Sequence, residues 1–76
     1  MDLSEFIVNA MKYIDRELDE VNPDSVNRSK VRGKINVLIV SQANELIVLS
    51  RNERQKAIDS IYRRCLSQEL FKNKGE

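Results

Sequence analysis

The chain has 76 residues, of which 41% are hydrophobic and 33% are charged, and its formal net charge is +1. This length allows one small domain, spanning 1–76, and the content of Val, Ile and Leu is too high for a disordered chain. A single cysteine, Cys65, and no histidine exclude an intramolecular disulfide and the usual Cys/His zinc clusters, so we expect tight helix packing or association to stabilise the fold.

The opening residues MDLSEF are acidic and polar and lack the basic start of a signal peptide. The sequence also contains no apolar run of about 18 residues that could span a bilayer. Together with the lone thiol, these features predict a cytoplasmic protein that does not cross a membrane.

Residues 2–21 are predicted to form an amphipathic helix. Asp2 and Glu5 match a capping box, and the apolar residues that follow recur at spacings of three and four. A second helix is expected from 23, because Asn22 is a good N-cap and Pro23 suits the first helical position.

The segment 34–50, KINVLIVSQANELIVLS, contains ten apolar residues, and Gly33 precedes it. In one interpretation Gly33 caps a helix and 35–49 forms a β-hairpin, which would make the protein α+β; the branched side chains favour strands. In the other, the helix crosses Gly33 and continues to 49. We expect the long helix, because a turn at 41–44 would contain neither Gly nor Pro and a lone hairpin is marginal in water.

A third helix is predicted at 51–71, since Ser50 and Glu53 again match a capping box. Its apolar face includes Cys65, which we interpret as a core residue. Residues 72–76 should fray. The predicted fold is therefore an all-α three-helix bundle in which the central helix, 23–49, is the longest.

A helix at 34–49 would be apolar on every side, and two flanking helices cannot cover all of it. The uncovered remainder is predicted to be a strip formed by Val37, Val40, Asn44 and Ile47. We interpret this strip as a self-association surface, most simply that of a two-fold homodimer in which Asn44 sets the register.

Charge is distributed unevenly along the chain. Residues 1–27 carry seven acidic and two basic side chains, whereas 28–76 carry eleven basic and five acidic ones. This division predicts pairing of the acidic first helix with the basic region, within or between subunits; alternatively, the basic residues contact nucleic acid. The densest basic cluster consists of Arg28, Lys30, Arg32 and Lys34.

No catalytic, cofactor-binding or metal-ligating pattern is evident, since Ser-His and Cys-His nucleophile pairs need histidine and the one Gly-Lys pair lacks the other residues of a phosphate loop. The sequence therefore predicts a non-enzymatic module that binds another protein as an adaptor, regulator or inhibitor. A nucleic-acid-binding regulator is the alternative.

Overall fold

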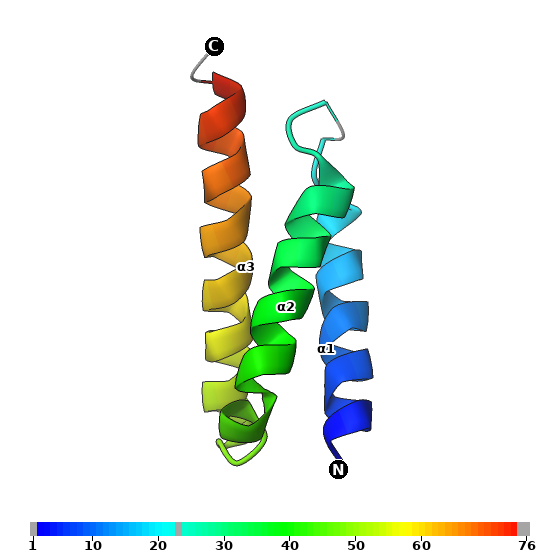
Figure 1. The fold of residues 1–76 in the computed structure, drawn as a ribbon, viewed down its shortest axis with the longest axis vertical. Coiled ribbons are helices and arrows are strands. Elements are labelled where there is room, and N and C mark those ends of the chain that lie inside the picture. The colour runs from blue at the N-terminus through cyan, green and yellow to red at the C-terminus, as the bar shows by residue number, and fades with distance from the viewer. Residues whose placement is uncertain (1, 23, 75–76) are drawn as a thin grey trace.

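The computed structural model describes residues 2–22 and 24–74, with side chains up to residue 70. It contains the helices α1 (Leu3–Leu18), α2 (Arg28–Leu46) and α3 (Arg51–Lys74), and no strand among these residues. The all-α prediction is confirmed, and the alternative hairpin at 35–49 is wrong. Figure 1 shows α2 between α1 and α3 and antiparallel to both.

Both predicted capping boxes are present. Asp2 Oδ1 accepts the Glu5 backbone N–H at 2.7 Å, and Glu5 Oε1 accepts the Asp2 N–H at 3.4 Å. At the start of α3, Ser50 Oγ accepts the Glu53 N–H at 3.2 Å and Glu53 Oε1 accepts the Ser50 N–H at 3.4 Å. Each box satisfies backbone donors that a helix start leaves unpaired, which explains why sequence located these two starts.

The start of α2 differs from the prediction. The N-cap is Asn27, whose Oδ1 accepts the Lys30 N–H at 3.1 Å, whereas Asn22 Oδ1 accepts the Asp24 N–H at 2.9 Å within a turn. The chain offered two asparagines of similar capping strength. Starting the helix at the second one allows Val26, in the linker, to be buried in the core.

The lengths of the helices also correct the prediction. α2 has 19 residues and ends at Leu46, with residues 47–49 in the turn to α3, so it is shorter than predicted at both ends. The longest of the three helices is α3, with 24 residues; it continues to Lys74, beyond the predicted end at 71. Residues 75–76 of the predicted frayed tail lie outside the described residues.

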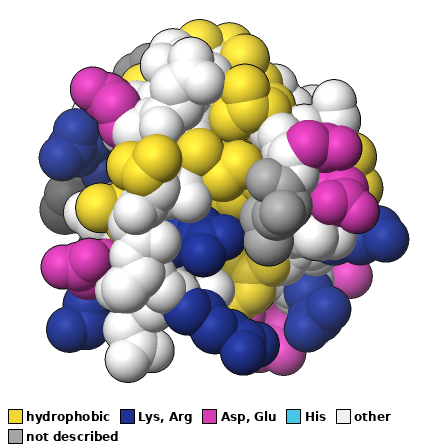
Figure 2. Space-filling model, turned by 90° about the horizontal axis from the view of Figure 1, so that it is seen from below, with side chains coloured by type: hydrophobic (Ala, Val, Ile, Leu, Met, Phe, Trp, Pro, Cys, Tyr) yellow, Lys and Arg dark blue, Asp and Glu magenta, His cyan; other side chains and the backbone are white. Residues whose placement is uncertain are grey.

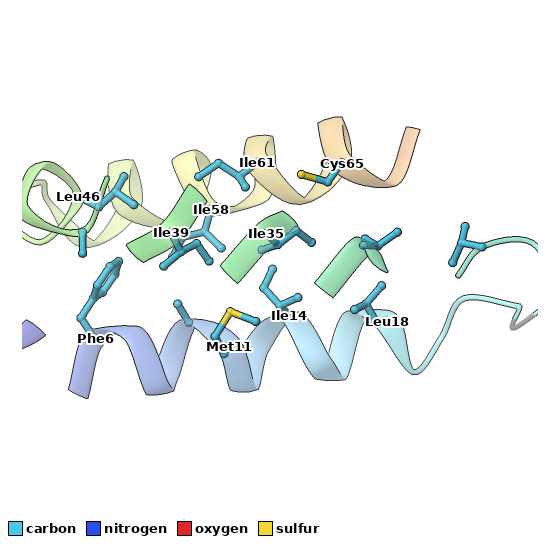
Figure 3. Packing of buried hydrophobic residues seen from close by; sticks show 14 residues of the cluster. Phe6, Met11, Ile14, Leu18, Ile35, Ile39, Leu46, Ile58, Ile61 and Cys65 are labelled. Atoms are coloured by element: carbon cyan, nitrogen blue, oxygen red, sulfur yellow. The ribbon is translucent and has the colours of Figure 1, made fainter. Parts of the chain in front are cut away.

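The core lies along both sides of α2 (Figure 3). Val31, Ile35 and Ile39 of α2 have no exposed surface. They pack between two apolar faces, which are formed on α1 by Phe6, Ala10, Met11, Ile14 and Leu18 and on α3 by Ile58, Ile61 and Cys65. These are the arcs predicted from spacing, and α2 is the element that holds the other two helices together.

Candidate protein-binding face

The outer face of α2 carries exposed apolar side chains. At 100° per residue, positions 37, 40 and 44 fall on the side of the helix opposite the buried positions 35, 39 and 46. Val37 is 66% exposed, Val40 is 49% exposed, and Asn44 is exposed. α1 and α3 both pack on the inner side of α2, so neither covers these side chains, although α3 borders the surface near Val37.

The predicted strip is therefore largely uncovered within one chain. Ile47 is the exception, because it is only partly exposed and packs against the core. The spacing 37, 40, 44 and 47 is that of the a and d positions of a heptad, the pattern by which one helix packs along another. Whether a second chain occupies the strip stays a prediction.

Further apolar surface lies outside the strip. Val48 is 79% exposed in the turn after α2, and Val8 of α1 is 52% exposed. Figure 2 views the end of the molecule where α1 begins and α2 ends, and it shows hydrophobic side chains gathered between charged ones. The sequence analysis did not assign Val8 to any surface, because exposure at the edge of an amphipathic arc depends on where the neighbouring helix packs.

A groove of about 630 Å³ runs between α2 and α3 beside the strip. Figure 1 shows α2 tilting away from α3 toward the end of the molecule that contains the C-terminal part of α3. The groove is lined by Ser29, Lys30, Gly33, Lys34, Val37 and Leu38 of α2 and by Arg64, Cys65 and Gln68 of α3. Sequence reasoning missed it, since it depends on how far apart two helices lie.

Two members of the basic cluster bind the acidic end of α1. Arg32 Nε donates to Asp15 Oδ1 at 2.6 Å, and Arg28 Nη1 donates to Asp19 Oδ1 at 2.5 Å. The hydrogen bond from Arg32 lowers the pKa of the Asp15 carboxyl, although partial burial opposes the shift. The predicted pairing of the acidic first helix with the basic region is confirmed for these two arginines.

The other two members of the cluster point toward α3. Lys34 Nζ lies 3.0 Å from Glu69 Oε2, and Lys30 Nζ lies 3.8 Å from the same oxygen. Glu69 is buried, with only 4% of its surface exposed, so its carboxylate requires cationic partners. Sequence reasoning assigned no role to Glu69, because the spacing of residues within α3 does not show that two lysines of α2 lie beside it.

Cys65 lies in the core, as predicted, at 2% exposure. Burial raises the pKa of its thiol, whereas the charges of Lys34 and Arg64 oppose that shift. A protonated, enclosed thiol is a poor nucleophile. The side chain therefore acts as a small hydrophobic residue beneath the groove.

Within residues 2–22 and 24–74, no set of three or more Cys, Asp or Glu side chains is arranged to hold a metal ion. No helix in the same part of the chain combines the length and apolar character needed to cross a membrane. Comparisons with protein-family models, curated proteins and solved structures gave no match. The exposed strip, the groove and the ion pairs are thus the features on which a function can be argued.

Proposed function

We propose that this chain is a non-enzymatic protein-binding module, acting as an adaptor, regulator or inhibitor, and that it works as a two-fold homodimer. The observation that carries the proposal is the exposure of Val37 and Val40 in a heptad-spaced strip on the outer face of α2. The lone thiol supports a place in the cytoplasm.

The energetic argument rests on the two valines. Full burial of a valine contributes about 1.5–3 kcal/mol, so Val37, which is two-thirds exposed, leaves about 1–2 kcal/mol unrealised in the monomer. That is a substantial fraction of the stability of a chain of this size, which is roughly 4–11 kcal/mol. In a two-fold dimer both copies would bury the same side chains, which doubles the gain.

Asn44 and Ile47 define how the two helices would align. A polar side chain buried between two helices must form a hydrogen bond with a polar group of the other helix. This requirement disfavours alignments in which the two helices are shifted along each other. Ile47 already packs partly against its own core and would close the seam at the C-terminal end of α2. The proposed interface is therefore short, and we expect a dissociation constant on the order of 10–100 µM.

Sedimentation velocity over a range from a few to several hundred micromolar tests self-association. Val40→Lys places a charge in the middle of the strip, and Val8→Lys is the matched control because Val8 has similar exposure (52% against 49%) but lies on α1. We expect the wild type and Val8→Lys to dimerise as concentration rises, and Val40→Lys to stay monomeric with unchanged helicity. A wild type that remains a folded monomer throughout would remove the dimer from the proposal.

Nucleic-acid binding is the second candidate function, and the basic cluster is the observation that favours it. Its four side chains are only partly exposed, and every one lies in an intramolecular ion pair: Arg28, Lys30, Arg32 and Lys34. Phosphates would compete with Asp19 and Asp15 for Arg28 and Arg32, whereas Lys30 and Lys34 share the one carboxylate of Glu69 and keep one positive charge in excess. The cluster therefore does not offer a stripe of four free cations, and we favour protein binding. Retardation of DNA or RNA that disappears steeply with added salt would support the second candidate.

A further inference from the structure

We propose that the groove between α2 and α3 binds an acidic amphipathic helix of a partner protein. The inference rests on the proposed role as a protein-binding module, and it does not require the homodimer. The groove combines an apolar floor with a basic rim, and its length matches a short helix.

The floor of the groove is formed by the half-buried Leu38 and the buried Cys65, and Gly33 and Val37 line its exposed edge. Nothing lies within 4 Å of the position that a Cβ of Gly33 would occupy. A glycine weakens the interior of a helix, yet no neighbouring group of this chain uses the space it leaves. That space, next to the two-thirds exposed Val37, can receive a large aliphatic side chain from outside.

The rim of the groove is basic. Lys30 and Lys34 stand on the α2 side and Arg64 on the α3 side, and no acidic residue lines the groove among the side chains that the structure describes. Glu69 lies behind the two lysines and compensates only one of the three positive charges. Its buried carboxylate accepts a hydrogen bond from Lys34 Nζ at 3.0 Å, so this ammonium group needs little reordering when an anionic group approaches. A ligand that places carboxylates on both sides of an apolar stripe is the complementary partner.

The dimensions favour a helix as the occupant. The α2 residues that line the groove run from 29 to 38, which corresponds to about 14 Å at a rise of about 1.5 Å per residue. Both walls are helices, and a third helix packs into such a channel with aliphatic residues at positions i, i+3 or i+4, and i+7.

A second copy of this chain is a poorer occupant than an acidic partner. Its own groove carries the same basic rim, so groove against groove would bring like charges together. Two carboxylates at the C-terminal end of α1 are in addition already bound within the chain, Asp15 by Arg32 and Asp19 by Arg28. The charge pattern therefore indicates a different protein.

Fluorescence anisotropy with a labelled synthetic peptide tests the proposal. The probe is a helix-forming peptide of about 18 residues, with leucine at heptad-spaced positions and glutamate flanking them; the counterpart has lysine in place of glutamate. We expect the acidic peptide to bind at least about tenfold tighter than the basic one, and its affinity to fall with added salt. Equal binding of the two peptides would overturn the proposal.

Two variants locate the binding site. Arg64→Glu reverses a charge on the rim, and Arg63→Glu is the matched control, because Arg63 is the neighbouring exposed residue on α3 and does not line the groove. Gly33→Leu adds an aliphatic side chain to the lining of the groove, and its Cβ would meet nothing within 4 Å. We expect Arg64→Glu and Gly33→Leu to weaken peptide binding by about tenfold or more, and Arg63→Glu by less than about twofold. Circular dichroism checks that all three stay folded. Equal effects of Arg63→Glu and Arg64→Glu would show unspecific charge attraction and sink the groove proposal.

The same titration on Val40→Lys separates the groove from the dimer. Val37 belongs both to the strip and to the groove, so a dimer would compete with the peptide. If the acidic peptide binds Val40→Lys at least as tightly as it binds the wild type, the result supports the groove proposal, whether or not the wild type dimerises. Loss of peptide binding in Val40→Lys, a substitution outside the groove lining, would refute it while leaving the dimer to be judged by sedimentation.

Discussion

Substituting Gly33 by alanine gives a sharp test of the fold, because the two interpretations of the sequence predict opposite signs. In the structure Gly33 lies inside α2, its φ is not positive, and an added Cβ meets nothing within 4 Å. No packing or strain term is therefore added, and only the difference in helix propensity remains. Gly33→Ala should stabilise the protein by about 0.8–1 kcal/mol. For a chain of this length, that corresponds to an increase of about 3–8 °C in the melting temperature.

Urea unfolding followed by circular dichroism measures this change, and all variants must be compared at one protein concentration because self-association would add to stability. Ser41→Ala is the companion variant: Ser41 is exposed on the same helix, and we expect a smaller gain of about 0.5 kcal/mol. If Gly33 capped a helix before a hairpin, alanine would instead suffer a left-handed backbone and Ser41 would lie in a turn. A loss of stability in Gly33→Ala would refute the continuous α2.

Three further predictions concern the core and its edges. Tyr13 donates a hydrogen bond to Asp59, and this bond, with partial burial, raises the pKa of Tyr13 from 10.0 to about 12. The unfolding free energy should therefore fall as the pH rises from 10 toward 12. Urea titrations at several pH values should show that Tyr13→Phe loses about 1 kcal/mol of unfolding free energy near neutral pH and has a smaller decline at high pH. Ile39→Ala should lower the unfolding free energy, measured with denaturant, by about 2–5 kcal/mol because Ile39 is fully buried. Val40→Ala, at the next residue, should change it by no more than about 0.5 kcal/mol. Similar losses at both positions would contradict the assigned faces of α2. The Cys65 thiol should react with a disulfide reagent roughly 100-fold or more slower in the native protein than in urea, and a fast native reaction would contradict its burial.

The sequence determined those features that depend on local chemistry. The starts of α1 and α3 follow from side chains that cap backbone donors three residues away, so Asp2 with Glu5 and Ser50 with Glu53 located them. The buried faces of α1 and α3 follow from apolar spacing, because 100° per residue fixes which side chains share a side. α2 is apolar on every side, so the packing of its neighbours decides which of its faces is buried. The continuity of α2 through Gly33 also followed from local propensities, since 41–44 lacked a residue that would turn a hairpin.

The tertiary structure decided what depends on distances between helices. Asn22 and Asn27 were equivalent caps in the sequence, and the burial of Val26 selects the second, which shortens α2 and leaves α3 the longest. Only the packing of α2 against α3 brings Lys30 and Lys34 to the buried Glu69 and opens the groove above Cys65. Residues separated by 35 or 39 positions meet there through the tilt of two rigid helices, and no periodicity within either helix encodes that tilt.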